Sequence, residues 1–442
     1  MARKMRDSGV EWIGEVPEGW EVNRLQWHLE ELVEKNDPIQ TTNILSLTND
    51  RGVIPYEDKG NVGNKAKENY TEYKLAYKNT IVANSMNVLI GSVGLSKYDG
   101  CVSPVYYIYK SKDSNSIRYY NYLFQLTPFQ KELRRYANGI LEIRLRVSSS
   151  DILKRSVPAP SFSEQRRIAD YLDEKCAAID GAVGDLKRGI EDCKAWKKAI
   201  IFEAVTGKAN VLAAKNAKVA KRQMRDSGIP WIGEIPEGWE ICKALYALSM
   251  PITDGPHTTP ELFDHGVPFV SAEAVSCGNG SIDFAHIRGY ISEVFYQECC
   301  QKYIPHRDDI FMIKSGATTG RVAIVDTDER FTIWSPLAVF RVKPEKALPK
   351  YFFYMLQSPV YQKQVELGWS YGTQQNIGMR ALEQLKILMP PLPEQQAIAD
   401  YLDEKCAAID ALVAEKEKLI ADLEAYKKSL IFELVTGKRE VA

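Results

Sequence analysis

The 442-residue chain lacks a long hydrophobic run. Its least polar stretch, residues 81–95, is interrupted by polar side chains at Asn84, Ser85, Asn87 and Ser92. No segment approaches the roughly 18 uninterrupted apolar residues of a membrane-spanning helix. The first residues, MARKMRDSGVEW, have no apolar core of the kind that a signal peptide needs. We therefore expect a cytoplasmic protein with no membrane partner.

Motifs for metal binding and catalysis are also missing. The eight cysteines form no CxxC pair, and they show no zinc-site spacing with the five histidines. The sequence has no GxxxxGK[ST] phosphate loop, no HExxH and no GxSxG. The segment Met389-Pro390-Pro391-Leu392 does not match the Asn/Asp-Pro-Pro-aromatic motif of amino-methyltransferases. We expect no metal site, no bound cofactor and no catalytic residue in this chain, which favours a binding protein over an enzyme.

Net charge carries little information, but its distribution is uneven. The formal net charge is −1, which does not by itself indicate a nucleic-acid binder. Residues 131–155 hold seven basic and three acidic side chains, and residues 208–225 hold six basic and no acidic ones. Local basic segments of this kind suit an anionic ligand.

Two stretches of the chain occur twice. Residues 5–21 read MRDSGVEWIGEVPEGWE and residues 224–240 read MRDSGIPWIGEIPEGWE, while 168–180 and 398–410 are identical. The first copies are offset by 219 residues and the second by 230, so the second insert is 11 residues longer. This period indicates duplication of a whole domain with its connector, because solenoid repeats are only about 20–50 residues long. Two similar modules related by a pseudo-two-fold suit a bipartite target.

Each identical stretch begins a connector with apolar residues at seven-residue spacing, as in a coiled coil. Ser161 with Glu164 forms a capping-box pattern, Pro393 suits a first helical turn, and Gly207 and Gly437 suit left-handed caps. Helices of about 40 residues would be ~60 Å long. We predict that they pair as an antiparallel coiled coil that holds two variable domains apart; alternatively, each helix packs only on its own domain. The predicted seam comprises Leu172, Ile179, Val183, Leu186, Ile190, Ile200, Leu402, Ile409, Val413, Ile420, Leu423 and Leu430.

The inserts between the repeats have an α/β (α+β) pattern in the same order: strands, one helix, then a polar loop. In the first insert we predict strands at 80–83, 88–93 and 102–109 and a helix over 117–136. In the second we predict strands at 267–271, 309–313, 321–325 and 332–342 and a helix over 349–367. Residues 208–222, rich in Ala and Lys, are expected to link the halves.

Polar loops in both inserts carry the candidate binding residues. The segment 254–260, DGPHTTP, can present donors and acceptors to base edges, and 314–321, KSGATTGR, combines small residues with two cations that suit a phosphate. Plain surface turns would explain both segments equally well. Each insert also ends in a polar loop, with Arg suited to guanine or phosphate in the first and amides suited to adenine in the second. The candidates are Arg144, Arg146, Asp254, His257, Thr258, Thr259, Lys314, Ser315, Thr318, Thr319, Arg321, Tyr371, Thr373, Gln374, Gln375 and Asn376.

Over nearly its whole length the chain resembles the specificity subunit of Type I restriction-modification systems. The residues that carry the resemblance are the WIGEVPEGW and WIGEIPEGW segments, GCVSPVY at 100–106, DGPHTTP at 254–260, SGATTGRVA at 315–323 and PPLPEQQAIA at 390–399. Pro256 departs from the family pattern, in which Thr is usual. The order and duplication of these motifs are more specific than any one of them.

The resemblance implies a non-catalytic DNA-binding subunit with two target recognition domains, each of which binds one half of a bipartite double-stranded site. The long helices would set the distance between half-sites and dock two methyltransferase (modification) subunits, and restriction subunits would join them. S-adenosylmethionine, ATP and Mg would then bind to those partners. The expected division is 1–157 for the first domain, 158–207 for the first helical spacer, 208–223 for a basic linker, 224–389 for the second domain and 390–437 for the second spacer.

Another class of function fits the repeats: a coiled-coil scaffold that joins two protein-binding α/β domains. It accounts for the helices but not for basic and amide-rich loops at matching places in both inserts. A stand-alone nuclease or methyltransferase is disfavoured by the missing motifs. The sequence does not give the recognised bases or the gap length, because readout also depends on DNA deformability and on water.

Overall fold

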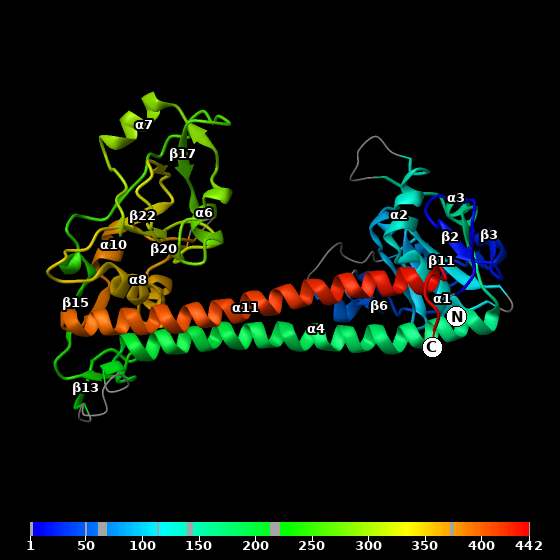
Figure 1. The fold of residues 1–442 in the computed structure, drawn as a ribbon, viewed down its shortest axis with the longest axis horizontal. Helices are drawn as coiled ribbons and strands as arrows, with labels where there is room; N and C mark the ends of the chain where they lie inside the picture. Colours follow the sequence, from blue (N-terminus) through cyan, green and yellow to red (C-terminus); the bar gives the residue numbers. More distant parts are fainter. Residues whose placement is uncertain are drawn as a thin grey trace. The chain divides into compact units, whose positions relative to one another are not determined.

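The computed structural model describes residues 3–48, 51–60, 69–112, 115–138, 145–212, 222–371 and 375–441. The chain divides into two compact units, Met1–Lys187 with Glu417–Ala442 and Arg188–Lys416. Two 44-residue helices, α4 (Phe162–Val205) and α11 (Leu392–Val435), each contribute one half to either unit (Figure 1). A unit therefore contains one insert and parts of both connectors, an exchange that a linear list of domain boundaries does not express.

The first unit is built on a four-stranded antiparallel sheet. Its strand order is β4-β11-β8-β9, with bounds Leu29–Leu32, Tyr106–Ser111, Ile81–Asn84 and Val93–Leu95. Two smaller antiparallel pairs accompany it, β5-β6 (Leu45–Thr48, Gly52–Pro55) and β7-β10 (Lys74–Ala76, Gly100–Val102). Helices α1 (Ile117–Phe124) and α2 (Thr127–Arg134) bury aromatic side chains against this sheet, including Tyr119, Phe124 and Phe129.

The second unit has a four-stranded antiparallel sheet of the same order, β16-β22-β19-β20. Its strands are Thr253–Asp254, Leu337–Phe340, Ile310–Ile313 and Val322–Ile324. An added sheet, β18-β17-β21 (Tyr290–Ile291, Val267–Val270, Thr332–Ile333), includes one parallel pair. Helices α6 (Ala272–Cys277), α7 (Glu293–Cys300), α8 (Pro349–Gln357) and α9 (Pro359–Leu367) complete the unit. The common strand order confirms the fold shared by the two diverged inserts.

Prolines divide both helices predicted in the inserts. The helix expected over 349–367 is two helices, because Ser358 is extended (φ −66°, ψ 150°) before Pro359. The helix expected over 117–136 breaks at Leu126, which is also extended, and Pro128 then occupies the first turn of α2. A proline ring fits a first turn, whose N–H groups have no helical acceptor, but not a helix interior.

Two strand predictions also need correction. Residues 88–93 are not a strand, because Val88–Ile90 form a 3-10 helix that ends at Gly91 with φ +84°. Residues 332–342 are two strands, separated by a turn in which the Leu337 amide donates to the Trp334 carbonyl (3.0 Å). The run 102–109 is divided in the same way, since β10 ends at Val102 and β11 begins at Tyr106.

The repeated opening segments attach to the long helices through matching contacts. They form the pairs β1-β2 (Met5–Asp7, Glu15–Pro17) and β13-β14 (Met224–Asp226, Glu234–Pro236). The strands that follow, β3 (Glu21–Arg24) and β15 (Glu240–Lys243), pair with β12 (Ser156–Ala159) and β25 (Lys386–Met389), just before each long helix.

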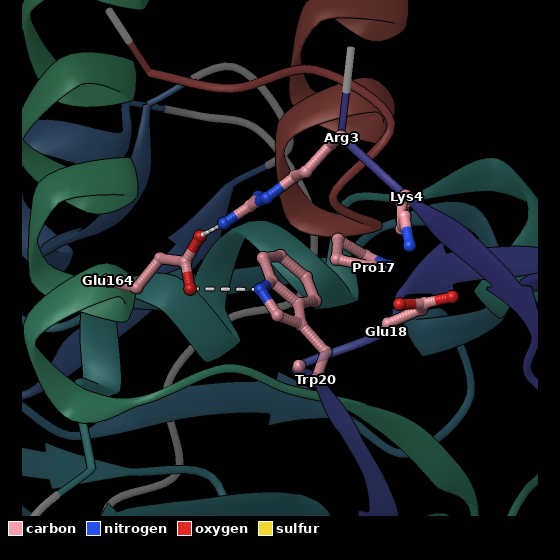
Figure 2. A pocket seen from close by; sticks show the side chains of 7 residues that line it. Arg3, Lys4, Pro17, Glu18, Trp20 and Glu164 are labelled. Carbon is pink, nitrogen blue, oxygen red and sulfur yellow. Dashed lines mark hydrogen bonds and ion pairs between the residues drawn. The ribbon is translucent and has the colours of Figure 1, made fainter. Parts of the chain in front are cut away.

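A pocket in the first unit shows how this attachment is made (Figure 2). The Arg3 guanidinium and the Trp20 indole N–H both donate to Glu164, in the first turn of α4. The second unit repeats this with Arg222, Trp239 and Glu394. Glu164 therefore does not complete the predicted capping box; its amide approaches Ser161 Oγ (3.4 Å), but its carboxylate binds the opening segment.

Each opening segment also packs on the end of the long helix that belongs to the other copy. Gly437, after α11, has φ +74°, and a Cβ there would lie 2.5 Å from Pro17 and 3.1 Å from Trp20. Gly207, after α4, has φ +73° and lies equally close to Pro236 and Trp239. Both glycines thus form the predicted left-handed caps and leave room for the partner segment. Each unit is built from both copies of the repeat.

The long helices pair antiparallel in both units. In the second unit Lys197 of α4 binds Asp410 of α11, and in the first unit Asp180 of α4 binds Lys427 of α11. Partner numbers rise along α11 as they fall along α4, which confirms the antiparallel arrangement predicted from the seam. Most seam side chains are buried, but Leu186, Val413, Ile420 and Leu423 are only half-buried. Of the described helices, none is both long and apolar enough to cross a membrane.

Candidate nucleic-acid interface

In the second unit the segment 254–260 leaves the sheet at the end of β16. Gly255 is packed so closely that a Cβ would lie 1.9 Å from the Ile333 carbonyl oxygen, which excludes any other residue there. The Pro256 carbonyl accepts from the Ser335 amide (3.2 Å). The loop is therefore held to the β21–β22 connection, while His257, Thr258 and Thr259 are exposed.

The segment 314–321 connects β19 to β20 as a compact turn. The Lys314 amide donates to the Pro336 carbonyl (2.8 Å), and the Thr319 hydroxyl donates to the Gly316 carbonyl (2.7 Å). Gly316 and Gly320 have φ values of +105° and +93°, which L side chains rarely adopt. The small residues that suggested a phosphate site thus have a conformational reason as well.

Backbone contacts bring the three candidate segments of the second unit together. The Gly316 amide donates to the Gln375 carbonyl (3.0 Å), the Ile377 amide donates to the Lys314 carbonyl (2.9 Å), and Ser315 forms an isolated bridge with Asn376. Lys314 also pairs with Asp254. Segments about 60 residues apart in the sequence, each a candidate for its own residue types, therefore form one surface.

Individual candidates differ in how they present their side chains. Gln375 and Asn376 are exposed, and Lys314, Ser315, Thr318 and Thr319 are half-buried. Arg321 is exposed, but it donates to the Ser276 carbonyl (2.9 Å) and so contacts the end of α6. Tyr371 pairs through its backbone with Gln375, in β23-β24 (Ser370–Tyr371, Gln375–Asn376). Thr373 and Gln374 lie outside the described residues.

Asp254 is the one candidate whose burial opposes direct contact with DNA. Only 1 % of its side chain is exposed, and it accepts a hydrogen bond from Lys302. Lys314 Nζ and His257 Nε2 each lie 3.3 Å from its second carboxylate oxygen. A carboxylate so enclosed holds cationic side chains in place and cannot reach a base edge, so the prediction of a base contact is corrected to an anchoring role.

The same position on the first unit holds Arg146. There the Val147 amide donates to the Ser85 carbonyl (3.4 Å), as the Ile377 amide does to Lys314. Strand register aligns Asn84 with Ile313, so Ser85 matches Lys314, and Arg146 then matches Asn376. Arg146 is exposed beside Met86 (3.7 Å to Sδ). Arg144 lies outside the described residues.

The anchor beneath the loop has no counterpart in the first unit. Strand register places Leu32 opposite Ile108 and Thr253 opposite the matching Val339, so Val33 occupies the position of Asp254. Val33 is exposed and apolar. The two units therefore share a frame but differ in the chemistry of their loops.

Sequence analysis missed Lys302 and Arg288. Lys302 follows α7 and binds both the Asp254 carboxylate and the Gly255 carbonyl (3.1 Å), while the Arg288 guanidinium stacks on Trp334 at 4.0 Å. Neither residue belongs to a motif or to a repeated segment, so the sequence gives no signal for them. With Lys302 and Lys314 around one buried carboxylate, the loop cluster has more positive than negative charge, which suits an anionic ligand.

The predicted seam residues form the helix pair and are not an open docking surface. Leu172, Ile179, Leu402, Ile409 and Leu430 are buried. The exposed apolar residues of the helices lie elsewhere, notably Trp196 (55 % exposed) and its repeat equivalent Tyr426 (48 %). A partner that docks on the helices would contact such side chains.

Comparisons with known proteins agree with this arrangement. The family described as Type I restriction modification DNA specificity domain matches residues 17–180 and 256–422, more than half of the chain. A Methanocaldococcus jannaschii protein assigned as the type I restriction enzyme MjaX specificity subunit is 27% identical over 97% of this chain and 96% of its own length. The Escherichia coli type I restriction enzyme EcoBI specificity subunit is 22% identical over 66% of this chain and 60% of its own.

A solved structure from a study of complex assembly and conformational transition of the type I R-M system has the same fold. It aligns with a TM-score of 0.68 at 17% identity, over 96% of this chain and 99% of that chain.

Proposed function

Because the chain belongs to the family of Type I restriction modification DNA specificity domains, we propose that it selects the DNA target of a type I restriction-modification complex. In this proposal each unit contacts one half of a bipartite double-stranded site. The chain itself performs no chemistry, and methylation and cleavage belong to methyltransferase and restriction subunits. Its DNA ligand agrees with the cytoplasmic location expected from the sequence.

The observation that carries the proposal is the matched position of Arg146 and Asn376. Both follow the polar loop at the end of an insert, and both precede a residue whose amide binds the connection after the third strand of the sheet, at Ser85 or at Lys314. The frame is thus the same while the presented group changes from a guanidinium to an amide. Arg suits guanine and Asn suits adenine in the major groove, so two such sites would recognise two different half-sites.

Neighbouring residues divide into two roles. Gln375, Thr258 and Thr259 are exposed and can meet base edges. Lys302 and Lys314 lie on the same cluster and suit backbone phosphates, which set the register of a protein on the duplex but not its sequence preference. The near-neutral charge of the chain implies that partner subunits share the phosphate contacts.

The paired helices are the proposed docking element for two methyltransferase subunits. The duplicated contacts give every surface on them a repeat equivalent, so one partner could bind in the same way on each unit. Trp196 and Tyr426 are matched exposed aromatics of the kind that dominates protein interfaces. We further propose that helix length sets the number of base pairs between the half-sites.

The test is selection from a randomised duplex library by the full chain assembled with its methyltransferase subunit. The wild-type complex should enrich a bipartite sequence, Arg146→Ala should relax one position in one half, and Asn376→Ala should relax one position in the other half. Equal affinity for all sequences at moderate salt would contradict the proposal, because phosphate contacts alone give that result. Such a result, or purification without a methyltransferase subunit, would favour a protein-binding scaffold.

A further inference from the structure

The buried carboxylate of Asp254 lies directly beneath the exposed loop of the second unit. Lys302 donates a hydrogen bond to its Oδ1, and Lys314 Nζ and His257 Nε2 each lie 3.3 Å from its Oδ2. Among the described residues no group donates a well-formed hydrogen bond to Oδ2. An unsatisfied buried carboxylate oxygen is costly, so it favours an N–H group on whichever neighbour faces it.

His257 is the neighbour that can also reach a ligand. Its side chain is 72 % exposed, and the ring directs Nε2 toward Asp254. In a neutral imidazole one nitrogen carries the proton and the other accepts, and the group that faces one nitrogen decides which. A carboxylate oxygen facing Nε2 places the proton there, which leaves Nδ1 as a hydrogen-bond acceptor.

The lysines fix the carboxylate that orients this ring. Lys302 binds the Asp254 carboxylate and the Gly255 carbonyl at once, and Gly255 has no room to shift against Ile333. Lys314 approaches from the end of β19 with only 13 % of its side chain exposed. Oδ2 therefore has a defined direction, which it passes on to His257.

We propose that Asp254 is a positioning residue that makes His257 Nδ1 an acceptor for the exocyclic amino group of one base in the second half-site. Adenine N6 and cytosine N4 carry such amino groups in the major groove, whereas guanine and thymine present acceptors there. The inference rests on the proposed function and deepens it. The device belongs to the second unit alone, because Val33 occupies the matching position in the first.

An Asp254→Asn substitution tests the inference because it reverses one contact. Lys302 keeps the amide oxygen as its acceptor, so the new NH₂ replaces Oδ2 and faces His257 Nε2. The histidine proton then moves to Nδ1, which becomes a donor. In library selection by the assembled complex, the ratio of adenine or cytosine to guanine or thymine at one second-half position should fall about tenfold or more, as for loss of a good base contact.

Matched variants separate orientation from simple stability. His257→Ala should reduce the same ratio at the same position, and adding Asp254→Asn to it should have no further effect, because coupled residues are not additive. His265→Ala, an exposed histidine of the same unit, should leave the preference unchanged. An unchanged ratio in Asp254→Asn or His257→Ala, or equal loss in both half-sites, would overturn the inference. His257→Ala alone decides the question if Asp254→Asn does not fold.

Nitrogen NMR of the histidine-labelled full chain gives a readout without DNA. The His257 signals should report a proton on Nε2 in the wild type and on Nδ1 in Asp254→Asn. A proton on Nδ1 in the wild type refutes the inference whatever DNA the complex binds. A wild-type complex with no sequence preference would instead refute the proposed function, so the two failures are distinguishable.

Discussion

Lys197 of α4 places its Nζ 2.7 and 2.6 Å from the two carboxylate oxygens of Asp410 in α11. The repeat equivalents exchange helices, so Lys427 of α11 binds Asp180 of α4 with both distances at 2.7 Å. One ion pair of the helix bundle is thus present twice, once in each unit. It is a direct sign of the pseudo-two-fold that the duplicated sequence encodes.

Removing either ion pair should weaken the unit that contains it. We expect Lys197→Ala to lower the free energy of unfolding by about 1 kcal/mol and Lys427→Ala by about half as much, because exposed pairs contribute less than partly buried ones. Asp410 is 34 % exposed, whereas Asp180 is 61 % exposed. Urea unfolding measures both. Lys175→Ala is the control, since its pair with Glu174 is local and exposed; an equal loss there would contradict the assignment.

Gly255→Ala should disrupt the second unit's loop. The new methyl would lie 1.9 Å from the Ile333 carbonyl, so the 254–260 segment must leave its position. Selection by the assembled complex should then lose preference in one half-site and keep it in the other. Gly238→Ala, in the same unit but with open space around its Cβ, should have no effect. Loss of both half-sites with Gly255→Ala would show that the units are not independent.

Trp196 and Tyr426 should each support one methyltransferase subunit. Truncation of an interface aromatic costs about 2 kcal/mol or more when it is an anchor. Trp196→Ala or Tyr426→Ala should therefore weaken one of two binding events roughly thirtyfold or more, and the double variant should weaken both, as measured by calorimetry or by native mass spectrometry. Tyr246→Ala, which removes a 62 %-exposed aromatic away from the long helices, is the control. Unchanged stoichiometry and affinity in the double variant would place the docking surface elsewhere.

Cysteine reactivity should report the integrity of the helix pair. Burial raises the pKa of the Cys406 thiol to about 11, and burial also raises that of its repeat equivalent Cys176. Because only the thiolate is alkylated, both should react slowly at pH 8 and faster as pH rises toward 11. Cys277 is exposed and should react first, as followed by mass spectrometry. Labelling of Cys406 as fast as Cys277 at pH 8 would contradict the packed seam.

Much of the frame was predictable because it is written twice. The identical stretches gave the two helices and their pairing, and Gly207 and Gly437 fixed their ends to the residue. The exchange of helix ends between the units was not predictable, since no local pattern specifies that Trp20 packs beside Gly437. Glu164 illustrates the limit: its position suited a capping box, but a tertiary contact with Arg3 and Trp20 replaced the local one.

The candidate interface was predictable in its parts but not in its assembly. Segments with Gly, Thr, Lys and amide residues indicated ligand binding, yet only the fold brings Lys314 beside both Asp254 and Gln375. The burial of Asp254 could not be foreseen, because it depends on Lys302, which follows a helix of the added sheet region with no motif of its own. Prolines 128 and 359 did carry the signal that each predicted insert helix is divided.

The most direct test of the account is a domain exchange. Residues 22–157 would be replaced by the corresponding segment of the Methanocaldococcus jannaschii relative, and the assembled complex would select from a randomised duplex library. The account predicts that one half-site changes, while the other half-site and the gap between them stay as in the wild type. A change in both half-sites, or in neither, would contradict the claim that each unit recognises its own half.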